Sequence, residues 1–466
     1  MKQHICLRPN STGWLQTNRY LLIMLTVFTT GFILQSCKKN AAADVQNMQL
    51  QAAVQSDDAE TAAKIQATVL TWNNAATVAV TRMAPLTGSG PLPPMPESRI
   101  YAIVNIAIHD ALNTVTPVYA RYAFSGNIQK NASPDAAVAQ AAHDAIVALL
   151  PPQQGYADSL LQVSLNKITN GNPKTAGIKI GVAAAAAILA KRKDDGADIA
   201  QFTMEQGTLP GQYRSTPPFD GPPFNGFMAV PGWGNIKPFT LIKGAQFRPG
   251  PPYRVTSAAY TKDYNEIKTL GGVVSKRTAD QTQIGLFWLP NIPLLSNNLA
   301  RLLIAKQKIT NAWTTARLFA LVQIAEADAN IACLNAKYNY FYWRPYTAVH
   351  LADADGNPNT KGDSTWQPLA APTPPVPDYP SNHAVNGGAG LKVMADFFES
   401  DNISFTMTSP NLPGVTRSFT SLHGAAVENA LSRIYAGYHF RNAVMTGLTM
   451  GENIGDYVFM HVLGPE

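Results

Sequence analysis

The segment PSNHAVNGGAGLKVMADFF, residues 380–398, opens on a helix-start signal and continues as an apolar helix. Ser381 stands at the cap position, so the free backbone N–H groups and the positive end of the helix face outward there. A helix start of this kind is a ready site for an anion. His383 lies in the first turn, where it could deliver a proton to a bound anion.

Outward from this segment, the chain shows helical periodicity and almost no strand alternation. The spacing predicts helices before a proline-rich middle over residues 57–83, 99–115 and 134–150, another that begins near Gln153, and one over 178–193. The last of these is alanine-rich and is predicted to be buried. Helical periodicity returns at about Ser257.

Residues 194–253 differ from the rest, because Pro and Gly crowd together there. The stretch is too aromatic for a disordered linker. We expect it to wrap across the helical core and to bury five aromatic side chains: Phe219, Phe224, Phe227, Trp233 and Phe239.

The composition excludes several classes of protein. The sequence has 466 residues, of which 46% are apolar, and this fraction excludes an intrinsically disordered chain. The formal charge of +6, from 36 basic and 30 acidic residues, is too small and too scattered to indicate nucleic-acid binding. Three cysteines cannot build a disulfide framework.

Residues 1–36 have the features of an export signal: a basic leader, then the apolar run 21–34. A small residue and Cys37 follow, which resembles the bacterial lipoprotein signal and implies that Cys37 is acylated and becomes the new N-terminus. An uncleaved N-terminal anchor is the alternative. We expect an exported protein, lipid-anchored to a bacterial cell membrane and facing the periplasm or the surface, with a polar tether over 37–56.

The residues suited to chemistry gather in the second of two expected helical parts, 57–255 and 256–466. Lys337 and Arg344 are seven residues apart, a spacing that places both cations on one face if a single helix carries them. Pro345 suits the first turn of a following helix.

A further segment pairs Arg433 with His439. Six residues on one helix would separate them by about 120°, but Gly437 can end the helix in a left-handed turn and swing His439 round. Together the segments supply cations, a hydroxyl at a helix start and two histidines. That set can enclose a tetrahedral oxyanion.

The order and spacing match a family signature: Lys-x6-Arg-Pro, then Pro-Ser-Gly-His, then Ser-Arg-x5-His. On these motifs the sequence resembles the vanadium-dependent haloperoxidases and type 2 phosphatidic acid phosphatases, and most fully the soluble bacterial haloperoxidase-type members. The likeness extends to Ile106–Ala111 and to Arg277–Thr282, and covers most of residues 60–460. It implies an all-α fold of helical bundles with one oxyanion pocket.

The resemblance also implies a role for each motif residue. His439 would coordinate the vanadium of a vanadate cofactor, or attack phosphorus in a phosphatase, and His383 would be the acid–base group. Vanadate would act as a Lewis acid without changing its oxidation state. The non-bridging oxygens would be bound by Lys337, Arg344, Ser381, the Asn382 backbone N–H and Arg433.

Two positions depart from the family pattern. Asn382 stands where Gly is usual; Asn tolerates a left-handed backbone, so anion binding would survive, although its amide could narrow the pocket. Ala443 stands where phosphatases carry the Asp that orients the last His, so we expect His439 to lack its carboxylate partner. This loss counts more against a histidine nucleophile than against a vanadate ligand.

Three functions are consistent with these residues. We favour a vanadate-dependent haloperoxidase that acts on hydrogen peroxide and halide. The first alternative is a phosphomonoesterase of the acid phosphatase type, which cleaves a phosphate ester through a phosphohistidine at His439. The second is a surface lipoprotein that binds an oxyanion without turnover. Elsewhere, His109 and Asp110 are expected to form a hydrogen-bonded core pair, and His423 to lie at the surface.

Overall fold

The computed structural model of the chain describes residues 59–83 and 92–466. The predicted export signal, the lipidated Cys37 and the tether lie outside these described residues. The described chain is mostly helical, which confirms the predicted all-α class. Its α-helices are α2 (Ala59–Thr81), α4 (Pro94–Val115), α5 (Pro134–Leu149), α6 (Gln154–Asn166), α7 (Asn172–Arg192), α8 (Ala258–Leu270), α9 (Ala279–Phe287), α10 (Ile292–Lys306), α11 (Ala312–Tyr340), α12 (Pro345–Leu351), α13 (Asn382–Phe397), α14 (Leu422–Tyr435) and α15 (Arg441–His461). Short 3-10 helices cover Pro151–Gln153, Trp233–Asn235 and Ala352–Ala354, and a hairpin joins β1 (Phe405–Ser409) to β2 (Leu412–Phe419).

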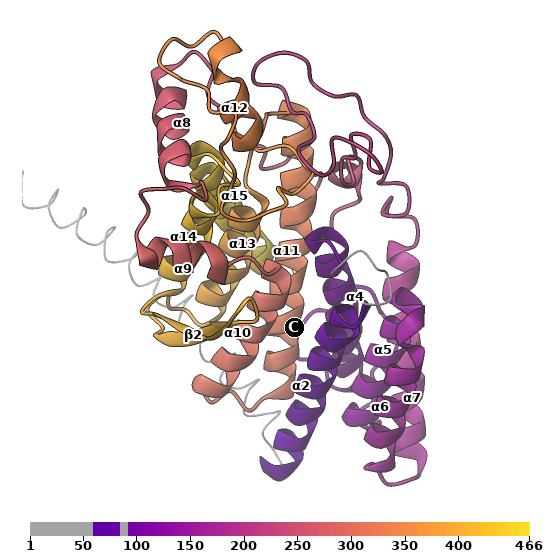
Figure 1. The fold of residues 1–466 in the computed structure, drawn as a ribbon. Coiled ribbons are helices and arrows are strands. Elements are labelled where there is room, and N and C mark those ends of the chain that lie inside the picture. The colour runs from indigo at the N-terminus through magenta and orange to yellow at the C-terminus, as the bar shows by residue number, and fades with distance from the viewer. Residues whose placement is uncertain (1–58, 84–91) are drawn as a thin grey trace, which may run out of the picture. The chain divides into compact units, whose positions relative to one another are not determined.

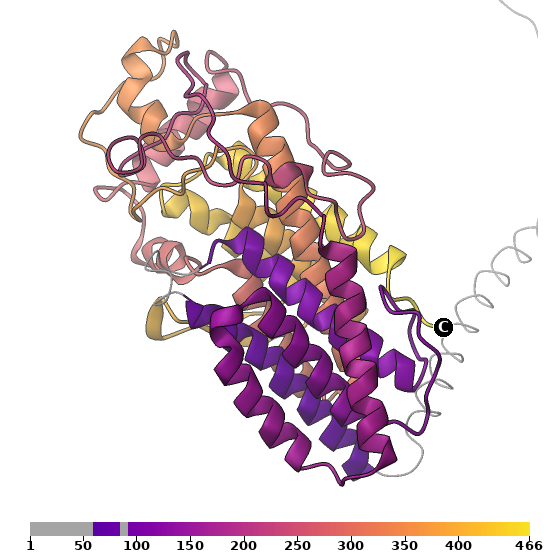
Figure 2. The ribbon, with the colours of Figure 1, turned by 90° about the vertical axis from the view of Figure 1, so that its right-hand side faces the viewer.

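Helices α2 and α4 to α7 pack side by side, with α5 in contact with each of the others (Figures 1 and 2). Their starts follow from the sequence. Ser133 Oγ caps α5 by accepting a hydrogen bond from Ala136 N, and Pro134 follows in the first turn. Pro94 and Pro96 lie inside the first turn of α4, where Pro costs no hydrogen bond, so this helix begins before the predicted residue 99.

Helix α7 is the alanine-rich segment, and by length and composition alone it could cross a membrane. Its packed face consists of small residues that allow α5 to approach closely. A Cβ added at Gly181 would lie 2.6 Å from Gln140 Cβ. Only 33% of the apolar window is buried, and Val182 is 47% exposed, so the prediction of a buried helix holds for one face only.

Helix α11 is the core helix of the described chain. It contacts α4 and α2 on one side and α13, α10 and α15 on the other, and nearly all its residues are buried (Figure 1). A helix that is buried all round usually carries only apolar residues. This one also carries Glu326, Asp328, Asn330 and Lys337 into the core.

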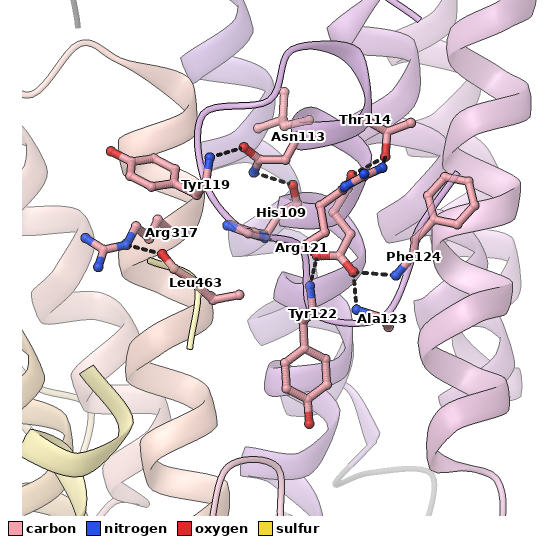
Figure 3. Close-up of polar contacts among 12 residues, drawn as sticks. His109, Asn113, Thr114, Tyr119, Arg121, Tyr122, Ala123, Phe124, Arg317 and Leu463 are labelled. Carbon is pink, nitrogen blue, oxygen red and sulfur yellow. Dashed lines mark hydrogen bonds and ion pairs between the residues drawn. The ribbon is translucent and has the colours of Figure 1, made fainter. Parts of the chain in front are cut away.

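Two buried carboxylates hold loops in place. Asp110 on α4 accepts three backbone N–H bonds of 2.6–2.9 Å from residues 122–124 (Figure 3). Asp328 on α11 accepts three of 2.6–3.0 Å from residues 239–241, in the proline-rich wrap. His109 Nδ1 lies 3.1 Å from Asp110 Oδ1, as expected of a core pair. Residues 106–111, which resemble the family, therefore include the carboxylate that holds this loop in place.

The proline-rich stretch is an ordered wrap, but it does not bury all of its aromatic side chains. Trp233 and Phe239 are buried, whereas Phe224 is 45% and Phe227 37% exposed. The expectation of burial was wrong for these two because they pack on Phe219 within the same loop. Their ring centroids lie 5.1 and 6.2 Å from that of Phe219.

The β1–β2 hairpin was not predicted. Its strands pair antiparallel with Phe405 opposite Phe419, and β1 alternates buried and exposed residues over five positions. An alternation this short is easily missed beside long helical patterns. Phe419 also packs against Trp288, with ring centroids 6.0 Å apart, so the hairpin covers the start of the α9–α10 connection.

Candidate oxyanion site

The site begins at the N-terminus of α13, where Ser381 is the N-cap residue. The Ser381 Oγ is buried and makes neither a capping bond nor any other hydrogen bond in the described chain. Its backbone N–H donates to Ala443 O at 2.9 Å, which ties this turn to α15. Asn382 is the first helical residue of α13, so the left-handed backbone that we considered for it is not needed.

Lys337 and Arg344 do not share a helix, contrary to the prediction from their spacing. Helix α11 ends at Tyr340 because Phe341 adopts a left-handed backbone with φ of 48°, and Arg344 becomes the residue before α12. Pro345 does occupy the first turn of α12, as predicted.

Both cations nevertheless reach one segment, residues 374–378. The Lys337 Nζ donates to the carbonyl oxygens of Pro377 at 2.6 Å and Asp378 at 3.0 Å. The Arg344 Nε donates to Val376 O at 2.8 Å. Burial lowers the pKa of Lys337 to about 7. An anion that enters beside it would therefore stabilise its protonated form.

Arg433 and His439 are brought together by the predicted left-handed turn. Gly437, with φ of 84°, ends α14, and the Gly437 N–H donates to Ile434 O at 3.0 Å. The Tyr438 N–H donates to Arg433 O at 3.0 Å, which completes a Schellman motif. The reversal turns His439 back toward the end of α14, where Arg433 lies.

His439 has a carboxylate partner that sequence reasoning missed. Its Nδ1 lies 2.8 Å from Asp378 Oδ1, and its Nε2 lies 2.9 Å from Arg344 Nη1. Arg344 can only donate, so Nε2 must accept and the ring proton must lie on Nδ1, facing Asp378. The expectation that His439 lacks a carboxylate because of Ala443 was therefore wrong: Asp378, from another segment, supplies it. Its position three residues before Ser381 is the only sequence signal that could have indicated it.

The electrostatics of the site favour an anion. Burial lowers the pKa of His439 well below its usual value, and the charges of Arg344, Lys337 and Arg433 lower it further. Burial raises the pKa of Asp378 to about 7 against the opposing effect of the two nearest cations. Three buried cations with one carboxylate leave an uncompensated positive charge, which is costly unless an anion enters.

His383 is placed to exchange a proton with a bound anion. Burial lowers its pKa well below the usual value, and Arg433 adds to that effect, so the ring is neutral at pH 7. Its Nε2 is buried and has no hydrogen-bond partner in the described chain. The carbonyl oxygens of residues 289 and 290 lie beside the ring and favour its protonated form.

The donor set fits an oxyanion such as vanadate or phosphate. Ser381 Oγ, Arg433 Nε and His383 Nε2 are buried polar atoms without partners in the described chain, and such atoms normally bond a ligand or water. Among residues 59–83 and 92–466, no group of three or more His, Cys, Asp or Glu side chains is placed to bind a metal cation. The unpartnered donors and the three cations would suit a vanadium held as vanadate.

The comparisons with known proteins point to the same family. Residues 317–464 match a family model described as the VCPO second helical-bundle domain. The chain is 29% identical to the vanadium chloroperoxidase of Curvularia inaequalis over an alignment of 288 positions, which covers 47% of this chain and 46% of that protein. It therefore spans about half the length of that relative.

Solved structures extend the likeness. A structure described as the first bacterial vanadium-dependent iodoperoxidase superposes with a TM-score of 0.70 at 26% identity, covering 85% of this chain and 97% of that one. The chain therefore resembles the vanadium haloperoxidases in the sequence of residues 317–464 and in its fold. A holo-type bacterial vanadium-dependent chloroperoxidase superposes with a TM-score of 0.63 at 18% identity, over 79% of this chain and 92% of that one, which shows the shared fold alone.

His423, Asp355 and Cys333 lie outside the donor set of the site. His423 lies at the surface and pairs with Glu452 at 2.7 Å. Asp355 accepts from the Asn357 N–H at 2.7 Å within a turn. Cys333 is a buried free thiol.

Proposed function

We propose that the protein is a vanadate-dependent haloperoxidase that uses hydrogen peroxide to oxidise halide. The observation that carries this proposal is the state of His439, whose Nε2 lone pair points at Arg344 of the cationic cluster while Nδ1 donates to Asp378. A neutral imidazole with its proton fixed on the far nitrogen is the form that ligates a metal centre. The likeness to vanadium chloro- and iodoperoxidases supports the same assignment.

The residues of the chain divide the work. His439 Nε2 would hold the vanadium, while Lys337, Arg344 and Arg433 would neutralise the oxygens and Ser381 Oγ would donate to one of them. Bound vanadate would supply a Lewis acid. His383 Nε2 would accept a proton from hydrogen peroxide and return it to the peroxide oxygen that leaves when the O–O bond breaks.

The test uses the full chain, purified in detergent and freed of phosphate. We expect oxidation of iodide or bromide that needs peroxide and added orthovanadate and that phosphate suppresses. His439→Ala should abolish this turnover with the fold intact by circular dichroism, and His423→Ala, at the surface, is the matched control. Absence of vanadate-dependent turnover with every halide would refute the proposal.

A phosphomonoesterase is the second candidate, favoured by one specific observation. Asp378 restores the carboxylate that a histidine nucleophile needs, although Ala443 occupies the usual position. Hydrolysis of p-nitrophenyl phosphate without vanadate, with acid-labile phosphate trapped on His439, would establish it. No hydrolysis in the chain that oxidises halide would exclude it.

A non-catalytic oxyanion binder is the least supported function. It requires the Asn382 side chain to obstruct the pocket. The Asn382 Nδ2 instead donates to Asn330 Oδ1 at 2.9 Å, toward α11.

A further inference from the structure

Asn330, on the core helix α11, is a fully saturated buried hub. Its Nδ2 donates to Ser98 Oγ at 2.8 Å and to Glu326 O at 3.0 Å. Its Oδ1 accepts from Asn382 Nδ2 at 2.9 Å and from Asn386 Nδ2 at 3.0 Å. Bonds to both ends of the amide fix its orientation, since a flipped group would set donors against donors.

The two amides that meet Asn330 Oδ1 lie on successive turns of α13. Asn382 belongs to the turn that presents Ser381 Oγ, its own backbone N–H and His383 to the oxyanion site. Asn386 lies one turn further into the helix and is 1% exposed. The same oxygen therefore holds one turn that forms the site and one that does not.

We propose that Asn330 and Asn382 are positioning residues that fix the anion-binding turn of α13. The importance of these residues for turnover rests on the proposed function. The hydrogen bonds that hold the turn do not depend on that function. A Gly at this position would have no side chain and could not make this bond. The Asn of this chain thus anchors the turn to α11.

The anchor stabilises the donors before the ligand arrives. Helix N-terminal N–H groups have no partners within the helix, so the first turn is the part that frays most readily. The first intrahelical bond here runs from Val385 N–H to Ser381 O at 3.0 Å. The amide bond from Asn382 to α11 holds this turn against the core, so less order must be gained on binding.

The decisive comparison is Asn382→Gly against Asn386→Ala. Each variant removes one donor from Asn330 Oδ1, but only the first releases the anion-binding turn. We expect Asn382→Gly to weaken phosphate binding by about three- to tenfold, the effect of losing one neutral buried hydrogen bond. Asn386→Ala should bind phosphate within about twofold of the unaltered chain, on the same scale.

Amide hydrogen exchange supplies a readout that needs neither ligand nor turnover. Exchange at Val385 should accelerate in Asn382→Gly and stay unchanged in Asn386→Ala. Asn382→Ala, which also removes the donor without adding a charge, should behave like Asn382→Gly and serves if the glycine variant fails to fold. Unchanged Val385 exchange and phosphate affinity in these variants, or an equal loss of affinity in Asn386→Ala, would overturn the proposal. If the unaltered chain binds phosphate but never oxidises halide, the proposed function fails while the anchor stands.

Discussion

Replacing Asp378 with Asn tests whether this carboxylate fixes the proton of His439. Asp378 Oδ1 lies 2.8 Å from His439 Nδ1, and both side chains are buried. Asn is nearly isosteric, so the main change is the loss of a charge-assisted hydrogen bond that contributes roughly 1.5–3 kcal/mol. Because about 1.36 kcal/mol corresponds to a factor of ten, vanadate affinity should fall about 10- to 150-fold.

The assay measures the vanadate dissociation constant by equilibrium dialysis and the rate of iodide oxidation at saturating vanadate. Near-UV circular dichroism checks that the core is intact. Asp158→Asn, on α6 with a side chain that is 53% exposed, is the matched control and should change neither quantity. An Asp378→Asn variant with affinity and rate both within twofold of the unaltered chain would refute the role given to Asp378.

Two further predictions rest on the geometry of the site, and a third rests on the sequence of the export signal. Since burial lowers the pKa of Lys337 to about 7, the ammonium loses its proton above that pH in the anion-free chain, and sulfate affinity, measured by calorimetry, should fall toward alkaline pH. Because burial also raises the pKa of Asp378 to about 7, a Lys337→Arg variant should keep only the part of this slope that ionisation of Asp378 contributes, and an undiminished slope would assign the pH dependence elsewhere. Gly437→Ala places a Cβ against the Gly271 carbonyl oxygen and 2.7 Å from Pro368 Cβ, at a residue with a φ of 84°. The substitution should therefore lower the free energy of unfolding by about 1–3 kcal/mol and weaken phosphate binding. Unaltered urea unfolding would contradict this. Cys37→Ser should abolish incorporation of radiolabelled palmitate in a bacterial host, and continued labelling would show that another residue is acylated.

The sequence predicted those parts of the site that depend on local rules. Ser381 at the N-cap position, Gly437 as a left-handed helix end and Pro345 as a first-turn residue each need only their neighbours in the chain, and the structure places all three as expected. Caps at Ser133 and the return of helix after Ser257 follow the same rules.

Features that depend on contacts distant in the sequence could not be predicted. Asp378 reaches His439 across 61 residues, and no periodicity links them. The relation of Lys337 to Arg344 was misjudged because Phe341 is a non-glycine residue in the left-handed region, which helical spacing does not reveal. Phe224 is exposed because the loop that carries it folds on itself.

The central claim is that a buried cationic cluster closes around an oxyanion held by His439. Equilibrium dialysis of the full chain against orthovanadate tests it most directly. We expect one vanadate per chain, displaced by phosphate, with binding lost in His439→Ala and kept in His423→Ala. Vanadate binding of equal strength in His439→Ala would place the oxyanion elsewhere and contradict the account.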